Sequence, residues 1–182
     1  RMSRRKQVYT PQGGGFLEDD RQVLTEILAP LARPLSLLEF GPGQSTWFFL
    51  GLGDVKLVSL ESDDAWYRAA VHEFRGVEHL ELYRFENSPQ LSIPEVDDRC
   101  FDVAFVDSPV GMPRRRIRLP GQVQLSRFNT LSYALERAPF AVLHDARRTA
   151  ERRTLARLSS LGFCVEFHGT RRGLAVVRKG NS

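Results

Sequence analysis

Four acidic residues of the sequence follow directly on short apolar runs, and their side chains could do chemistry together. Glu39 closes the run LLE, Glu61 closes LVSLE, Asp107 closes VAFVD and Asp145 closes AVLHD. Apolar runs of this length are typical of buried strands. One such acid could simply cap the next helix, but four in succession indicate a ligand site at the carboxyl edge of an open α/β sheet.

The turn after the first run, EFGPGQST, has the residue types of a ligand-binding loop. Gly41 and Gly43 allow a tight turn and a close approach of the backbone to a ligand. A helix that begins near Ser45 would present free backbone N–H groups there. Thr46 stands where a dinucleotide fingerprint requires glycine, and the sequence contains no GxxxxGK[ST] phosphate loop. The pattern therefore argues against NAD and ATP and favours a cofactor that carries an amino acid and a nucleoside.

Glu61 lies 22 residues after Glu39, at the end of the next run, where a carboxylate can accept hydrogen bonds from both hydroxyls of a ribose. This order of motifs resembles the class I S-adenosylmethionine-dependent methyltransferases over about residues 35–178. The resemblance implies S-adenosyl-L-methionine as cofactor, with the glycine turn around its methionine part and Asn87 near the adenine amine. The residues it assigns to the cofactor are Glu39, Phe40, Gly41, Gly43, Ser45, Thr46, Glu61, Ser62, Asn87 and Asp107.

Two later segments resemble a narrower family. Residues 101–111 (FDVAFVDSPVG) and 142–151 (VLHDARRTAE) are similar to the polysaccharide-biosynthesis methyltransferases of the glucuronoxylan 4-O-methyltransferase type. That family reads approximately D-x-x-x-V-D-x-P-x-G and then V-x-H-D-x-x-R-x-x-E, although the Ser/Thr of its glycine turn falls one place later than Ser45. The resemblance implies methylation of a hydroxyl on a saccharide or another small, acidic acceptor.

Asp107, His144 and Asp145 are the candidate catalytic residues, because a hydroxyl acceptor must lose a proton. A base can take the proton, and His144 or Asp145 could serve. A divalent metal could instead acidify the hydroxyl, with Asp107 and Asp145 as ligands for Mg²⁺, Mn²⁺ or Co²⁺. Resemblance to metal-using small-molecule O-methyltransferases supports the metal. A third reading has Asp107 contacting the methionine amine or capping a helix, and Asp145 anchoring Arg148.

Basic residues are concentrated in the second half of the chain. Residues 1–91 carry a net charge of −3 and residues 92–182 a net charge of +7, and 23 of the 26 basic residues are arginine. Arginine binds carboxylate and phosphate through two parallel hydrogen bonds. We expect Arg114, Arg115 and Arg116 on the long connection 108–125, together with Arg148, to bind an anionic acceptor.

The apolar runs alternate with helical patterns, which predicts βαβ units around a mostly parallel sheet. Expected helices cover 17–32, 45–52, 64–75, 126–137 and 147–161. Expected strands cover 35–40, 55–60, 77–83, 101–106, 139–143, 163–167 and 173–178. The last two are too close for a crossover helix and should form an antiparallel hairpin. We predict one α/β Rossmann-like methyltransferase domain over 16–182, with a seven-stranded sheet and helices on both faces, after a flexible arm at 1–15.

Composition favours a soluble globular protein, with 42% apolar and 26% charged residues and no run long enough to span a membrane. The expected compartment is the cytoplasm, or the secretory-pathway lumen if an N-terminal anchor has been removed. The expected partner is a small anionic acceptor, and a homodimer is a further hypothesis. Cys100 and Cys164 lack metal-site or redox spacing and are expected to pack as small apolar residues.

Two other functions stay open. The basic second half would suit an RNA methyltransferase, but the sequence lacks the N-P-P-Y type motif that holds a base's exocyclic nitrogen, so nucleic acid is not the expected partner. A non-catalytic binding module could keep the fold without turnover, and the intact glycine turn and four strand-end acids argue against it.

Overall fold

The computed structural model describes residues 15–109 and 127–180, so most of the expected N-terminal arm and of the long Arg-rich connection lies outside the described residues. The helices are α1 Glu18–Leu28, α2 Gln44–Gly51, α3 Asp64–Glu73, α4 Phe128–Arg137 and α5 Thr149–Ser160. The strands are β1 Leu35–Phe40, β2 Val55–Glu61, β3 Leu80–Arg84, β4 Val103–Val106, β5 Phe140–Leu143, β6 Phe163–His168 and β7 Leu174–Lys179.

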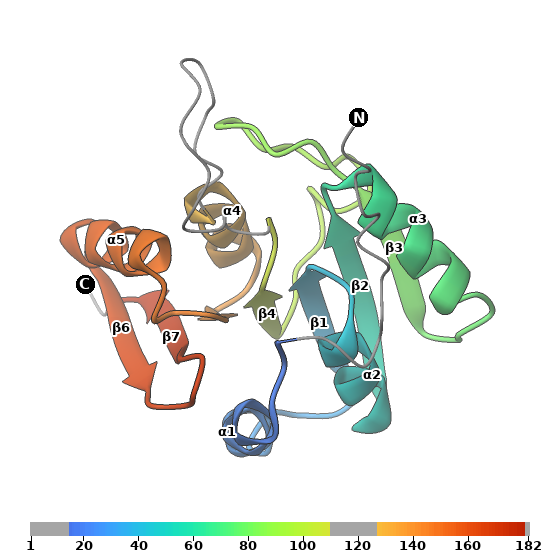
Figure 1. Ribbon diagram of the computed structural model, residues 1–182, viewed down its shortest axis with the longest axis horizontal. Coiled ribbons are helices and arrows are strands. Elements are labelled where there is room, and N and C mark those ends of the chain that lie inside the picture. Colours follow the sequence, from blue (N-terminus) through green and yellow to red (C-terminus); the bar gives the residue numbers. More distant parts are fainter. Residues whose placement is uncertain (1–14, 110–126, 181–182) are drawn as a thin grey trace, which may run out of the picture.

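The strands form one sheet in the order β3-β2-β1-β4-β5-β7-β6 (Figure 1). β3, β2, β1, β4 and β5 pair in parallel, whereas β7 runs antiparallel to both β5 and β6. This arrangement confirms the predicted α/β class, the mostly parallel sheet and the C-terminal hairpin. β1 is the switch point of the sheet, because the chain passes from β1 outward to β2 and β3 and then returns to β4 on its other side.

Two predicted boundaries are displaced for local reasons. α1 ends at Leu28 rather than at residue 32, because Pro30 has no backbone N–H with which to continue the helix. β3 begins at Leu80 rather than at residue 77, because Gly76 and His79 have positive φ angles of 76° and 64° that interrupt an extended chain. Neither change moves a residue of the predicted ligand edge.

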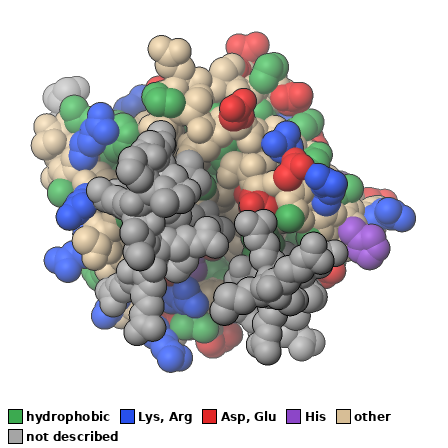
Figure 2. Space-filling view, turned by 45° about the horizontal axis from the view of Figure 1, so that its top comes forward, with side chains coloured by type: hydrophobic (Ala, Val, Ile, Leu, Met, Phe, Trp, Pro, Cys, Tyr) green, Lys and Arg blue, Asp and Glu red, His purple; other side chains and the backbone are tan. Residues whose placement is uncertain are grey.

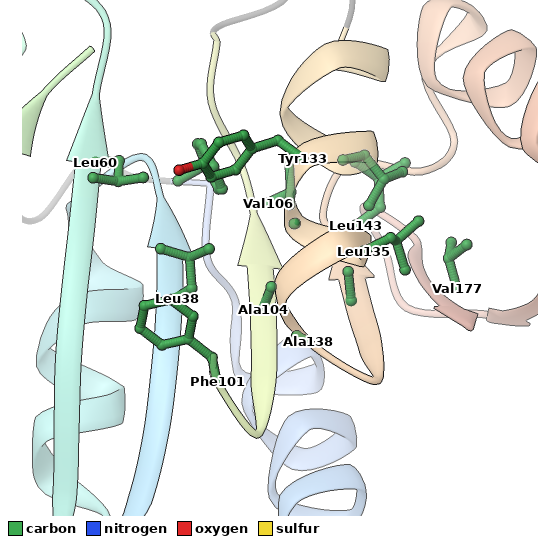
Figure 3. Close-up of a cluster of buried hydrophobic side chains, with 14 of the residues drawn as sticks. Leu38, Leu60, Phe101, Ala104, Val106, Tyr133, Leu135, Ala138, Leu143 and Val177 are labelled. Carbon is green, nitrogen blue, oxygen red and sulfur yellow. The ribbon is translucent and has the colours of Figure 1, made fainter. Parts of the chain in front are cut away.

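Helices cover both faces of the sheet, as predicted. Alternate residues of each strand point to opposite faces, so Leu37 and Leu38 of β1 belong to different buried clusters. Leu38 belongs to the first cluster together with Leu135 of α4 (Figure 3). Leu158 of α5 is a member of the same cluster. Leu37 packs in the second cluster with Leu24 and Leu28 of α1 and Phe49 of α2. The sheet is therefore held rigidly between two apolar layers.

The register of the sheet brings the four strand-end acids to one edge. Phe40 of β1 pairs with Leu60 of β2 and with Val106 of β4, and Val106 pairs with Leu143 of β5. Glu39 precedes this row by one residue, Glu61 and Asp107 follow it by one, and Asp145 follows it by two. The predicted common edge is confirmed.

The prediction for the cysteines is wrong, because both side chains are exposed as free thiols. Cys164 lies on β6, the edge strand, where Phe163 and Val165 pack toward the core and Cys164 points away between them. No described helix has the length and apolar character that crossing a membrane requires.

Candidate functional site

The glycine turn contains two glycines with different surroundings. Gly41 has a φ of 99°, and a Cβ built on it would lie 3.1 Å from Cβ of Ser108, so close packing against the end of β4 requires glycine here. Gly43 has extended backbone, and a Cβ there would meet no atom of the described residues within 4 Å. As far as the described residues go, the space over Gly43, at the start of α2, could therefore hold a ligand.

Glu39 holds this turn from inside the protein. Its carboxylate is fully buried and accepts hydrogen bonds from the hydroxyls of Ser45 at 2.5 Å, Thr46 at 2.7 Å and Ser59 at 2.7 Å. Burial raises the pKa of Glu39 to about 7, although the three hydroxyl donors oppose that rise. Thr46 also accepts a hydrogen bond from the N–H of Gly43 at 2.8 Å. Glu39 and Thr46 therefore shape the turn.

The remaining turn residues lie deeper or at the helix start. Phe40 is fully buried, with its ring edge-on to Phe85 and Tyr133 at centroid distances of 5.4 and 6.0 Å. Ser45 is buried in the first turn of α2. The structure thus places Phe40 behind the predicted cofactor site, where it packs under the turn.

Glu61 carries an anchored carboxylate at the end of β2. Its Oε1 atom accepts hydrogen bonds from the N–H groups of Ser62 at 2.6 Å and Asp63 at 2.8 Å and from Oγ of Ser108 at 3.2 Å. Burial raises the pKa of Glu61, and these donors lower it in part. Among the described residues, every hydrogen-bond donor to this carboxylate donates to Oε1. Oε2 is consequently the oxygen that suits the hydroxyls of a ribose.

Asn87 has an unsatisfied acceptor near the end of β3. Its Oδ1 atom is buried and receives no hydrogen bond from the residues that the structure describes. The neighbouring Phe85 donates its N–H to the carbonyl of Glu61 at 3.1 Å, which keeps this segment beside the end of β2. A buried orphan acceptor is uncommon and calls for a donor. The exocyclic amine of an adenine is a donor of the right kind.

The two acids of β4 and β5 meet in a buried charge cluster. Ligand atoms of Asp107, His144 and Asp145 all lie within 4.8 Å of one another. Fully buried His144 donates from Nδ1 to Asp107 at 3.0 Å and from Nε2 to Asp20 at 3.2 Å. Burial alone would lower the pKa of His144, but the carboxylates of Asp107, Asp20 and Asp145 raise it to about 9. His144 is therefore an imidazolium at neutral pH, which suits holding Asp107 better than taking a proton.

Arg127, just before α4, joins these acids and is a residue that sequence reasoning missed. Its side chain is 1% exposed, and Nη2 lies 2.9 Å from Asp107 and 3.5 Å from Asp145. Nε lies 3.7 Å from Glu151, and Nη1 donates to the carbonyl of His144 at 2.7 Å. No local sequence pattern predicts that this arginine is buried, because its acidic partners lie far away in the sequence.

Asp145 is enclosed by arginines. Arg148 lies 2.5 Å and Arg172 3.1 Å from its carboxylate, in addition to Arg127. This geometry agrees with the reading in which Asp145 anchors Arg148. Arg148 is accordingly engaged in the cluster, and the other expected acceptor-binding residues, Arg114, Arg115 and Arg116, lie outside the described residues.

This donor set does not fit a divalent metal. A metal-binding histidine must be neutral, whereas both ring nitrogens of His144 are committed to carboxylates that favour its protonated form. The carboxylate of Asp145 already faces three guanidinium groups. Asp107 retains an exposed fraction of 31% and also contacts a guanidinium.

A hollow of about 660 Å³ adjoins the cluster where the chain leaves β5. It is lined by Ala146, Arg147, Arg152, Leu155 and Phe167. The ring of Phe167 is 50% exposed, which is unusual for a large apolar side chain. Basic side chains also gather along the left side of the face in Figure 2. The hollow combines positive charge with an aromatic surface.

Solved structures with the same architecture place the chain among known folds. A Staphylococcus aureus protein provisionally named a caffeoyl-CoA O-methyltransferase is 12% identical, with a TM-score of 0.64 over 88% of this chain and 82% of that one. A precorrin-6y C5,15-methyltransferase from Geobacter metallireducens is 13% identical, with a TM-score of 0.62 over 91% and 89%. The chain has the class I methyltransferase fold.

A third structure agrees with this assignment. The TehB-like S-adenosylmethionine-dependent methyltransferase from Corynebacterium glutamicum is 13% identical, with a TM-score of 0.58 over 93% of this chain and 91% of that one. At these identities the likeness concerns the fold. No protein-family profile and no curated protein sequence matches the chain significantly, so the narrower resemblance to polysaccharide methyltransferases rests on residues 101–111 and 142–151 alone.

Proposed function

We propose that the protein is an S-adenosylmethionine-dependent methyltransferase that methylates a hydroxyl of a small anionic acceptor. The observation that carries the proposal is the pairing of an anchored carboxylate, Glu61, with a buried unsatisfied amide oxygen, Asn87 Oδ1, beyond two adjacent strands. An adenosine offers hydroxyl donors and an amine donor with a rigid connection between them. The fold shared with methyltransferases of known cofactor supports the same ligand.

The chain's own residues fit the cofactor from end to end. Oε2 of Glu61 would accept hydrogen bonds from the ribose hydroxyls, and Oδ1 of Asn87 would accept one from the adenine amine. The space over Gly43 would admit the methionine part, whose carboxylate would lie near the N-terminal end of α2, where the helix dipole favours negative charge. Asp107, which is partly exposed, would accept a hydrogen bond from the methionine amine. S-adenosylmethionine, when bound, supplies a sulfonium methyl group for in-line displacement.

The contribution of the protein to this reaction is alignment. The charge cluster holds Asp107 in one orientation. The serine and threonine hydroxyls around Glu39 hold the glycine turn. Groups held in this way can align the reacting atoms of the two substrates. His144 is protonated and Asp145 is held by arginines, so neither is a free base at neutral pH. Neither side chain takes the proton of the acceptor hydroxyl, which therefore leaves to solvent as the methyl group is transferred.

We propose the hollow beside the end of β5 as the acceptor site. A volume of about 660 Å³ lies within the range of small-molecule sites. Arg147 and Arg152 would bind a carboxylate or phosphate, and Phe167 would cover the face of a ring. We propose a uronic acid or another acidic hydroxyl compound, in line with the sequence resemblance of residues 101–111 and 142–151.

Calorimetric titration with S-adenosylmethionine and S-adenosylhomocysteine tests the proposed function. Glu61→Gln should weaken both ligands strongly, because a neutral amide accepts ribose hydroxyls poorly, and Glu86→Gln is the matched control at an exposed glutamate near Asn87. Binding followed by methylation of acidic saccharides supports the proposal. Methylation of RNA oligonucleotides instead would replace the proposed acceptor, and no binding by the wild-type protein would refute the cofactor.

A further inference from the structure

The guanidinium of Arg127 stands between the two acids that the sequence predicts as metal ligands. Its Nη2 atom lies 2.9 Å from Oδ1 of Asp107 and 3.5 Å from Oδ2 of Asp145. A single cation that bridges two carboxylates from adjacent strand ends is the arrangement a divalent metal would adopt. The bridging position is filled by a nitrogen of the protein.

The position of this guanidinium is built into the fold. Besides the two acids, Arg127 donates from Nε to the carbonyl of Pro109 at 3.2 Å and from Nη1 to the carbonyl of His144 at 2.7 Å. Its side chain is 1% exposed, so it cannot swing into solvent without opening the core. Arginine keeps its charge in such a place because its pKa lies far above neutral.

The two carboxylates on either side of Arg127 are already engaged by guanidinium groups. Arg127 contacts both Asp107 and Asp145, and Arg148 and Arg172 also contact Asp145. A divalent ion at the bridging position would be repelled by these guanidinium groups. It would also have to displace hydrogen-bonded guanidinium groups, and breaking buried pairs in this way is strongly unfavourable.

We propose that Arg127 is a fixed internal cation that takes the place of a divalent metal between Asp107 and Asp145. Arg127 is then a positioning residue, which acts through Asp107, and the site works without metal. This inference concerns the charge cluster alone and holds or fails independently of the proposed cofactor and acceptor.

Mn²⁺ binding, followed by the electron paramagnetic resonance signal of free Mn²⁺, tests the proposal on the full chain. The wild-type protein should leave Mn²⁺ free up to millimolar concentration. Arg127→Gln vacates the bridging position and leaves Asp107, Asp145 and Glu151 without their shared cation, so this variant should gain a saturable Mn²⁺ site. Arg153→Gln, at an exposed position of α5, is the matched control and should behave as the wild type. A purely structural role for Arg127 predicts no such gain.

Two results would overturn the proposal. The first is saturable Mn²⁺ binding by the wild-type protein that Asp107→Asn abolishes. The second is a folded Arg127→Gln variant, verified by circular dichroism, that binds no Mn²⁺. If Arg127→Gln does not fold, the wild-type titration decides, because a metal-free wild-type cluster supports the internal cation and a Mn²⁺-binding one contradicts it.

Discussion

His144, at the end of β5, lies 3.2 Å through its Nε2 atom from Asp20, a residue of α1 that stands 124 positions earlier in the chain. Asp20 is fully buried and also accepts a hydrogen bond from Thr170 at 2.7 Å. The first helix is thus tied by a charged contact to the carboxyl edge of the sheet. His144 in turn reaches Asp107 with its other ring nitrogen. The same imidazole ring therefore connects α1, through Asp20, to the carboxylate of Asp107.

Asp20→Asn should lower the pKa of His144, because one of the carboxylates that stabilise the imidazolium becomes neutral. The folded-state pKa of about 9 exceeds the ordinary 6.5, so the imidazolium stabilises the fold fully below pH 6.5. That contribution is lost as the pH rises through 9. NMR titration of the His144 ring measures the pKa directly, with Glu18→Gln on the exposed side of α1 as control. A wild-type His144 that titrates near 6.5 would contradict the cluster.

Glu39→Gln should change how stability depends on pH. Between pH 4.5 and pH 7 the native state holds a proton on Glu39 that the unfolded chain has released, so the free energy of unfolding falls as the pH rises through this window. The shift corresponds to about 3 kcal/mol. Glutamine removes this loss, so the variant should show a flatter profile in denaturant unfolding measured from pH 5 to pH 8. Glu26→Gln is the exposed control, and an unchanged slope in Glu39→Gln would refute the assignment.

The strand ends and the glycine turn were predictable from sequence because both follow local rules. Apolar runs of strand length identify β1, β2, β4 and β5, and parallel pairing then forces the acids that follow them to one edge. The position of Glu39 inside the protein was not predictable in this way. The hydroxyls of Ser45, Thr46 and Ser59 that surround it are ordinary residues until the fold brings them together.

Two members of the charge cluster, Asp20 and Arg127, escaped prediction for a different reason. In the sequence, Asp20 is one of three acids in the first turn of α1, where a favourable interaction with the helix dipole explains it fully. Arg127 falls at a helix start, where an exposed arginine is equally acceptable. Their buried partners lie far away in sequence, at His144 and Asp145, and pairing across such distances leaves no periodic signal. The hollow around Phe167 was missed likewise, because it forms between α5 and the hairpin.

Gly41→Ala and Gly43→Ala should separate folding from binding. Alanine at position 41 must adopt a φ of 99° and press against Ser108 at 3.1 Å, so we expect a loss of about 1–3 kcal/mol in the free energy of unfolding. Alanine at position 43 meets no described atom, so stability should be nearly unchanged while its methyl group fills the ligand space. Thermal unfolding and calorimetry on both variants test this, and equal effects of the two variants on cofactor affinity would count against it.

Asn87→Ala should weaken adenosine recognition without weakening the fold. The buried Oδ1 atom has no donor among the described residues, so its removal relieves an unsatisfied acceptor in the free protein. In the complex we expect a loss of roughly tenfold in affinity for S-adenosylhomocysteine. S-inosylhomocysteine, which lacks the exocyclic amine, should bind the wild-type protein and the variant with similar affinity. If the wild-type protein bound S-adenosylhomocysteine and S-inosylhomocysteine with equal affinity, Asn87 would not contact the adenine amine.

Arginine substitutions should act on the acceptor and spare the cofactor. Arg147→Gln and Arg152→Gln remove positive charge from the hollow, and the KM for an acidic acceptor should rise roughly tenfold for each lost charged hydrogen bond. Alanine substitution of Arg114, Arg115 and Arg116 should have the same signature. Steady-state kinetics with an acidic and a neutral acceptor distinguish the effects, and a fall in cofactor affinity instead would assign these arginines elsewhere.

The most direct test of the central claim is calorimetric titration of the wild-type protein with S-adenosylmethionine and S-adenosylhomocysteine, in EDTA and then with Mg²⁺, Mn²⁺ or Co²⁺. The geometry of Glu61, Gly43 and Asn87 predicts one-to-one binding of both ligands, with the same affinity with or without metal. Absence of binding under every condition would contradict the proposed methyltransferase. Binding that requires a metal would keep the cofactor and contradict the role given to Arg127.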